Sequence, residues 1–136
     1  MKAVYPDQGL GLMLSLVLSV TVKMKLFTNN YTPTRVSTTV DFTVAAWTGY
    51  ADAAIASGDW TNMGVVGHIE SLTAPDQAFL NSSGAPVDAY GYYITDNDGT
   101  VVLQAVRFDS APVSKADGES FVCSPKFGLA SKETSA

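Results

Sequence analysis

Clusters of turn-forming residues divide the second half of the chain into short segments, and this pattern limits the fold more than any other feature. The clusters are Thr73–Pro75, Asn81–Gly84, Asp96–Gly99 and Lys115–Gly118. Gly, Pro, Asn and Asp favour turns because of their backbone preferences, and the segments between the clusters have strand-like composition. The sequence therefore predicts strands at Val65–Leu72, Gln77–Leu80, Val87–Thr95, Thr100–Phe108 and Ser120–Leu129.

The dipeptide Asp98-Gly99 is the strongest local signal in this half. Such a pair accepts the positive φ angles of a tight turn, so it predicts a β-hairpin. Short strands joined at this spacing are typical of sandwiches and barrels. We therefore expect a mainly β fold, an antiparallel β-sandwich with a jelly-roll-like arrangement.

The first half of the chain has a less regular pattern. From Val20 the apolar residues alternate as far as Leu26, which predicts a half-buried strand that Asn29–Pro33 ends. The segment Asp41–Gly49 is expected to form a single helical turn with Gly49 as its left-handed end. A short strand is then predicted at Tyr50–Ala56.

The N-terminal segment has apolar residues at helical spacing, and Asp7 can cap a helix that follows it. We expect a short helix from about Gln8 to Ser19; the alternation of leucines also permits one long strand. The expected organisation is residues 1–19 as an N-terminal segment packed on the domain or on a neighbour, residues 20–130 as the β-sandwich domain, and residues 131–136 as a polar tail.

The composition limits the classes of partner. At 136 residues the chain is about one domain. Only 15% of its residues are charged, which is less than the average of about 25%, and weakly charged surfaces suit contacts between subunits. The net charge of −5 and the scattered basic residues argue against direct binding to nucleic acid or to an anionic membrane.

The segment Leu10–Val22 is apolar but is not expected to be a signal peptide or a membrane span. Only Lys2 precedes it as a basic residue, no A-x-A cleavage site follows, and it is short and rich in serine. The single cysteine, Cys123, excludes an intramolecular disulfide and is expected to be a small buried hydrophobe.

Motifs that would carry chemistry are weak. Asp96–Gly99 begins like a calcium loop, but Arg107 stands where a closing glutamate is needed, so a hairpin turn is the better reading. His68 is the only histidine, and with Cys123 it supplies too few ligands for a zinc site. A Ser-His-Asp triad could use His68, but the sequence has no G-x-S-x-G motif, so a structural histidine is the better interpretation. Glu70 and Asp76 are carboxylates that a glycosidase could use. We expect no catalytic residues, no metal and no cofactor.

Two apolar segments are candidates for subunit contacts. Tyr90, Tyr92 and Tyr93 occur in one predicted strand, where Tyr90 and Tyr92 would share a face; they could line a sugar site or a subunit contact, or pack in the core. The possible interface residues are Leu10, Leu14, Leu18, Tyr90, Tyr92 and Tyr93.

A resemblance of pattern covers most of the chain, from about Pro6 to Leu129. The segments Lys25–Pro33, Asp41–Thr43 and Thr48–Tyr50 resemble small proteins encoded by tailed bacteriophages and prophages, and the likeness continues in Val87–Asp96, Arg107-Phe108 and Pro125–Phe127. The chain departs from that pattern at Val44, where such proteins often carry an acidic residue. The resemblance implies a β-rich structural protein of the virion.

The expected function is therefore a capsid decoration or cement protein located in the virion. It would stabilise the shell through contacts with the phage major capsid protein or other virion proteins, and we expect a homo-oligomer. The alternative is a tail-fibre or receptor-binding module that recognises a host glycan. A small hydrolase that uses His68 is a third, remote possibility.

Overall fold

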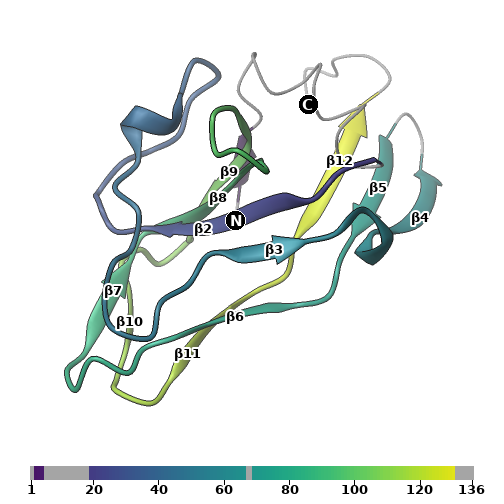
Figure 1. Cartoon of the computed structure of the whole chain (residues 1–136). Helices are drawn as coiled ribbons and strands as arrows, with labels where there is room; N and C mark the ends of the chain where they lie inside the picture. Colours follow the sequence, from purple (N-terminus) through teal and green to yellow (C-terminus); the bar gives the residue numbers. More distant parts are fainter. Residues whose placement is uncertain (1, 5–18, 67–68, 131–136) are drawn as a thin grey trace.

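The computed structural model describes residues 2–4, 19–66 and 69–130, and this part of the chain is built almost entirely from strands and loops (Figure 1). Every strand pair in it is antiparallel. Two short 3-10 helices interrupt the strands, η1 (Thr39–Asp41) and η2 (Ser57–Asp59). The predicted fold class, mainly β with antiparallel strands, is confirmed.

The largest sheet has five strands in the order β1-β9-β8-β2-β3. Its strands are β1 (Lys2–Val4), β2 (Val22–Phe27), β3 (Ala53–Ile55), β8 (Gly91–Asp96) and β9 (Val102–Arg107). The alternation predicted for the strand that ends near Leu26 is confirmed, because Val22, Met24 and Leu26 are fully buried and the lysines between them are half-buried.

The other strands form one three-stranded sheet and two ribbons. The three-stranded sheet has the order β12-β5-β4 and contains β4 (Thr61–Val66), β5 (Ile69–Thr73) and β12 (Lys126–Ala130). One ribbon pairs β6 (Gln77–Leu80) with β11 (Ser120–Cys123), and the other pairs β7 (Val87–Ala89) with β10 (Val113–Lys115). In Figure 1 the β6–β11 ribbon runs below β3.

The main core joins the large sheet to the β6–β11 ribbon and to β5 and β12. Alternate residues of β2 meet Phe79, Phe121 and Phe127 in one buried cluster. Gln104 is buried as well, and its side-chain amide donates a hydrogen bond to the carbonyl oxygen of Lys126 at 2.7 Å. Apolar burial therefore holds the sheets together, and this buried amide adds a specific contact between β9 and β12.

A second, smaller cluster covers the opposite face of the large sheet. The segment between β2 and β3 folds back and places Phe42 on Tyr93, with the two rings stacked at 4.4 Å. Phe27 meets Phe42 edge to face at 5.1 Å, and Tyr31 does the same at 5.3 Å. The large sheet is therefore apolar on both faces over this region, which explains the unbroken burial of Gly91 to Thr95.

The hairpin predicted at Asp98-Gly99 connects β8 to β9. Gly99 has a φ of 75°, and its N–H donates to the carbonyl oxygen of Asp96 at 3.1 Å. No residue other than glycine has a positive φ in the described chain, so Asp98 does not adopt the second positive φ of a type I′ turn. The turn is instead a longer loop with glycine in the left-handed position, and the register shifts at Ile94 and Thr95.

Three predicted strands are each divided in two, and the strands predicted at Tyr50–Ala56 and Thr100–Phe108 are shorter, as β3 and β9. Val65–Leu72 was expected to be one strand, but β4 and β5 pair there as a hairpin. Val87–Thr95 is divided between β7 and β8 at Tyr90, whose N–H donates to Phe27 and whose carbonyl accepts from Phe108, both at 2.9 Å. Ser120–Leu129 is divided near Pro125, because proline has no N–H for a ladder. The strand at Gln77–Leu80 is confirmed.

Two helical segments were predicted in the first half of the chain. The helical turn expected within Asp41–Gly49 is wrong in position: the 3-10 turn is Thr39–Asp41, and Val44 forms a β-bridge with Phe27. Gly49 does have a left-handed φ of 94°. The helix expected from about Gln8 to Ser19 lies outside the described residues except for Ser19, which is in a turn, and the tail 131–136 lies outside them as well.

Candidate protein-interaction site

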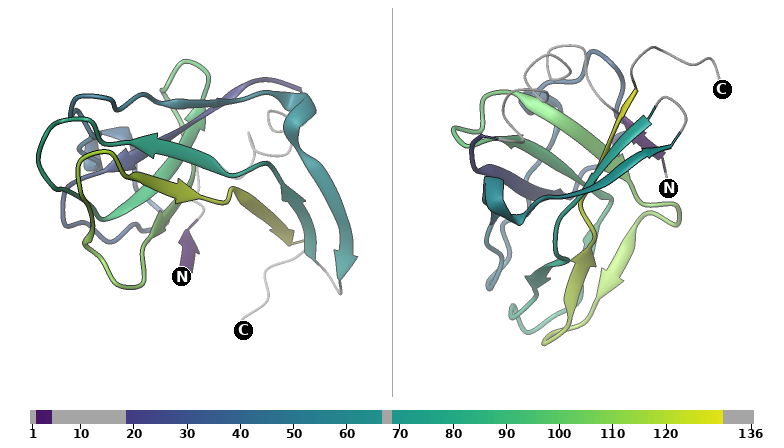
Figure 2. Two further views of the ribbon diagram at one scale, coloured as in Figure 1. Left: turned by 90° about the horizontal axis from the view of Figure 1, so that it is seen from below. Right: turned by 90° about the vertical axis from the view of Figure 1, so that its right-hand side faces the viewer.

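A groove runs between β10 and β11, which follow one another in the chain but do not pair. β10 pairs with β7 and β11 pairs with β6, so the two strands separate beyond the turn that joins them (Figure 2). The groove encloses about 460 Å³. It is lined mainly by Phe108, Val113, Phe121 and Val122, with Lys115 and Asp109 among the polar residues around them.

The hydrogen bonds of β6 show which edge of β11 is open. The N–H of Asn81 donates to Glu119 at 2.9 Å, on the edge that faces β11. Its neighbours bond on the opposite edge: the Leu80 carbonyl accepts from the Trp47 indole, and the Ser82 N–H donates to Thr48, both at 2.9 Å. Backbone groups alternate between the two edges of a strand, so the edge of β6 that faces away from β11 is already occupied.

The same alternation fixes the direction of the backbone groups of β11. Phe121 is opposite Phe79 and Cys123 is opposite Gln77, so these residues bond within the ribbon. Ser120 and Val122 consequently direct their N–H and C=O groups away from β6, into the groove. In the part of the chain that the structure describes, no strand pairs with β11 on this side. The groove therefore has an unpaired strand edge along one wall.

Exposed apolar side chains lie beside this edge and on one other segment. Val122 exposes 62% of its surface and Leu80 exposes 43%, both on the outer face of the β6–β11 ribbon. Val36 and Val40, in the segment that covers the second cluster, expose 77% and 88%. Sequence reasoning missed Val122. The signal was its place between the inward residues Phe121 and Cys123, since neighbours in a strand point to opposite faces.

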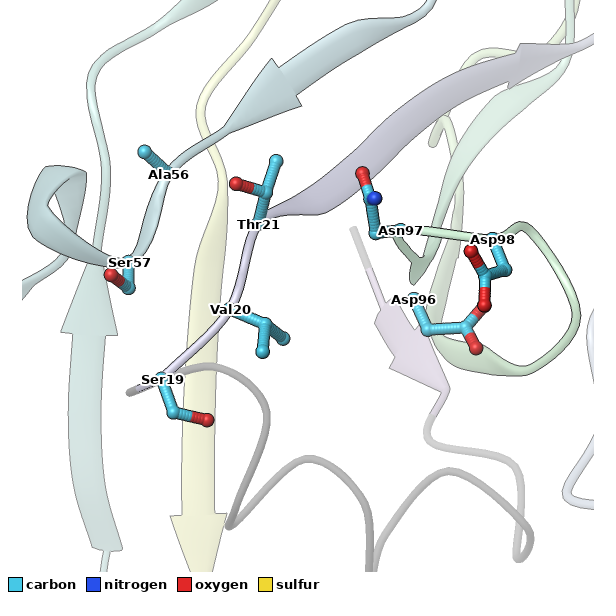
Figure 3. A pocket seen from close by; sticks show the side chains of 8 residues that line it. All are labelled: Ser19, Val20, Thr21, Ala56, Ser57, Asp96, Asn97 and Asp98. Carbon is cyan, nitrogen blue, oxygen red and sulfur yellow. The ribbon is translucent and has the colours of Figure 1, made fainter.

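A second hollow, of about 620 Å³, lies where the start of β2, the end of β3 and the β8–β9 hairpin meet (Figure 3). Asp96, Asn97 and Asp98 line one side, and Ala56 and Ser57 line the other. The carboxylate of Asp96 accepts hydrogen bonds from the backbone and hydroxyl of Thr100, each at 2.7 Å, and from the Val101 N–H at 3.1 Å. Asp96 therefore uses its carboxylate to hold the hairpin together.

Partial burial raises the pKa of the Asp96 carboxyl, but hydrogen bonds from Thr100, Val101 and Gly99 outweigh it and hold the pKa below its ordinary value of 3.8. The unfolded chain then binds more protons at acid pH. The stabilisation is present above the ordinary pKa and is lost as pH falls through the lower folded value. We expect Asp96→Asn to be less stable than the wild type near neutral pH, with a difference that shrinks on acidification.

Urea unfolding at about pH 6 and about pH 3 measures this difference. Asp98→Asn removes the same charge from an exposed position in the same turn and serves as the control. It should follow the wild type at both pH values. A deficit of Asp96→Asn that is the same at both pH values would contradict the role given to the carboxylate.

The structure separates the three tyrosines that were expected to lie on one strand. Tyr92 and Tyr93 are buried, with 5% and 4% of their surfaces exposed, and they belong to the two different clusters. Burial, together with the charge of Asp52, raises the pKa of Tyr93 to about 12. Of the three roles considered for the tyrosines, packing in the core is therefore the one that Tyr92 and Tyr93 have. Tyr90 lies between β7 and β8 on the Tyr93 side, so the prediction that it shares a face with Tyr92 is wrong.

Tyr90 is half-buried beside Arg107, whose guanidinium carbon lies 5.4 Å from the centre of the ring. The guanidinium also donates a hydrogen bond to the Tyr31 carbonyl at 3.1 Å. Arg107 stands at the position where a calcium loop would need a glutamate. In the structure it links β9 to the segment after β2. The leucines Leu10, Leu14 and Leu18 lie outside the described residues.

Cys123 is buried, as predicted, with 4% of its surface exposed. Burial, with a smaller effect of Asp76, raises the pKa of its thiol to about 12, so the thiol is protonated at neutral pH and is a poor nucleophile. Asp76 accepts a hydrogen bond from the hydroxyl of Ser124 at 2.6 Å. His68 lies outside the described residues, and Glu70 lies in β5.

A polar group at the edge of the large sheet has a structural role. The hydroxyl of Tyr50 donates to Asp52 at 2.7 Å and accepts from the N–H of Leu26 at 3.2 Å, and Asp52 lies 3.6 Å from the ammonium of Lys25. Burial and then the bond to Asp52 raise the pKa of Tyr50 far above its ordinary value. Its ring also stacks on Phe79 at 5.8 Å. Tyr50 thus anchors the segment before β3 on the core.

The described residues lack two features that mark common classes of functional site. They contain no group of three or more His, Cys, Asp or Glu side chains placed to hold a metal ion. They also contain no helix with the length and apolar character to cross a membrane. Comparison of the chain with models of protein families, with curated proteins and with solved structures found no match. The groove beside β11 and the exposed valines are surface features that suit contacts with other proteins.

Proposed function

We propose that this chain is a structural protein of a bacteriophage particle, a capsid decoration or cement protein that stabilises the shell by binding the major capsid protein or other virion proteins. The observation that carries the proposal is the exposure of apolar side chains on a weakly charged surface. Val36 and Val40 expose 77% and 88% of their area, while only 15% of the residues are charged. Exposed apolar side chains with few charges around them suit contacts with other proteins.

The sequence resemblance to virion-associated proteins of tailed phages supports the same proposal. For the fold we propose an antiparallel β-sandwich with a jelly-roll-like arrangement. The core supports this arrangement, because Val22 and Met24 of the large sheet meet Phe79, Phe121 and Phe127 from outside it in one cluster. Two layers of sheet that share such a core form a rigid body, which is what a protein that bridges shell subunits requires.

The burial of the tyrosines favours this function over a glycan-binding module. A receptor-binding site along the strand would need Tyr92 or Tyr93 to be accessible, and each exposes about a twentieth of its surface. Tyr90 alone of the three is half-buried, and the adjacent Arg107 already bonds to Tyr31. Tyr92 and Tyr93, which the glycan-binding alternative would place in a groove, are therefore packed in the core.

The test is binding to undecorated shells of the phage that encodes the chain, measured by co-sedimentation. We expect the wild type to bind and the double variant Val36→Ser, Val40→Ser to bind about tenfold more weakly or worse, since each buried valine contributes about 1.5 kcal/mol or more. Both valines are exposed, so the variant should melt with the wild type. A wild type that binds no shell would overturn the decoration proposal.

The control is Thr43→Val, which adds an apolar side chain at another exposed position of the same segment. It should retain binding, because it removes none of the proposed contacts. Loss of binding in this variant to the same extent as in the double variant would show that the assay reports a general change of the segment and would count against the valines as the contact.

A further inference from the structure

We infer that the open edge of β11 is a self-association site, at which two copies of this chain pair their β11 strands antiparallel about a two-fold axis through Val122. The resulting sheet has the strand order β6-β11-β11-β6 across the two copies. The inference concerns how copies pair with each other, and it holds whether or not the protein belongs to a virus particle.

The outward backbone groups of β11 have a self-complementary geometry. Ser120 and Val122 direct their N–H and C=O groups into the groove, and Ser124, the residue after β11, would follow the same alternation if pairing extends the strand by one residue. An antiparallel pair centred on Val122 places Val122 opposite its own copy and Ser120 opposite Ser124 of the other copy. All of these are hydrogen-bonded pairs of an antiparallel ladder, so one arrangement satisfies the whole open edge. A two-fold interface requires this kind of self-complementary surface.

The open edge itself is formed by small, uncharged residues. Natural edge strands are protected by charged side chains, by proline or by bulges. Glu119 and Pro125 flank the open edge, but Ser120–Ser124 itself contains neither a charged residue nor proline. Its outward side chains are Ser120, Val122 and Ser124, which are small enough to lie opposite their copies. Val122, exposed by 62% in the single chain, would be covered by the same residue of the second copy.

Charged residues lie at the two ends of β11. Asp117 and Glu119 are exposed in the turn before β11, and Lys126 is exposed just after it. Antiparallel pairing brings Asp117 and Glu119 of each copy next to Lys126 of the other, twice in each dimer; the carboxylate of Asp76, which accepts a hydrogen bond from Ser124, lies at the same end as Lys126. Parallel pairing would place like charges together. Charge complementarity therefore favours the antiparallel arrangement and a second copy of this chain as the occupant.

The groove provides the space for the second strand. The separation of β10 from β11 leaves about 460 Å³ beside the open edge, and its apolar lining includes Phe108 and Val113. A two-stranded ribbon is marginal alone, whereas a sheet of more strands with an apolar face is stable. Pairing through β11 converts two separate ribbons into one four-stranded sheet.

The experiment is sedimentation velocity over a range of concentrations with the wild type, Val122→Lys and Leu80→Lys. We expect a wild-type dimer. Val122→Lys should raise the dissociation constant about 100-fold or more, because it places like charges at the two-fold axis. The side chain points outward, so its circular dichroism and melting should stay those of the wild-type monomer. Leu80→Lys adds the same charge to the outer face of β6, away from the open edge, and should remain dimeric.

A cross-linking variant tests the register directly. Residues in a hydrogen-bonded antiparallel pair have Cα atoms about 5.5 Å apart, which a disulfide can span. Val122→Cys should therefore form an intermolecular disulfide on mild oxidation, while Leu80→Cys should not. The native Cys123 is buried and stays outside this reaction.

Several outcomes would overturn the inference: a wild type that is monomeric at millimolar concentration, a Val122→Lys dimer as tight as that of the wild type, or equal loss in Leu80→Lys. Each is read in solution without shells. Failure here with intact shell binding would leave the decoration proposal in place. A dimer that binds no shell would support the self-association site and overturn the decoration proposal.

Discussion

Replacement of Phe121 by alanine is expected to lower the free energy of unfolding by about 3 to 5 kcal/mol, the range for removing a buried aromatic side chain. Phe121 exposes 2% of its surface and lies in the main core, with its ring centre 5.5 Å from that of Trp47. The ribbon and the large sheet both contribute to that core, so their other contacts hold them in place and they cannot move together to fill the cavity. Urea unfolding followed by fluorescence measures the loss.

The neighbouring residue supplies the control. Val122→Thr keeps the β-branched shape, and because Val122 is exposed by 62% the change should stay within about 0.5 kcal/mol. Equal losses in the two variants would mean that the inward and outward faces of β11 have been assigned the wrong way round, and the open edge would have to be reconsidered with them.

Replacement of Gly91 by alanine is expected to destabilise the fold by about 3 kcal/mol or more, through overpacking. A Cβ atom at this position would collide with the carbonyl oxygen of Val106 and would lie 2.7 Å from the ring of Phe27. The carbonyl belongs to the backbone of the paired strand β9, so it can move only if the ladder shifts. Thermal unfolding with circular dichroism measures the effect.

Gly58→Ala is the matched control for Gly91→Ala, because a Cβ atom at Gly58 meets nothing within 4 Å. It should leave the melting temperature nearly unchanged. The double variant Gly91→Ala, Phe27→Leu separates the two collisions at Gly91. We expect little rescue from it, since the contact with the Val106 carbonyl remains, and a substantial rescue would show that the Phe27 ring is the main obstacle.

The sequence by itself determined the features that depend on neighbouring residues along the chain. The alternation from Val20 to Leu26 predicted the strand β2 and its buried face, because side chains in a strand point to opposite sides in turn. The left-handed glycine of the Asp98-Gly99 hairpin was predicted as well, since only glycine adopts a positive φ without strain. The burial of Cys123 followed from its apolar neighbours.

Only the tertiary structure decided which strands pair and which edge stays open. The break at Tyr90 depends on hydrogen bonds to residues far away in the sequence, such as the bond from the Tyr90 N–H to the carbonyl of Phe27. The burial of Tyr92 and Tyr93 on two different faces required a large sheet covered on both sides. The open edge of β11 exists because β10, its neighbour in the chain, pairs with β7 instead. Pairing is a property of segments brought together by the core, and a one-dimensional pattern of apolar residues does not record it.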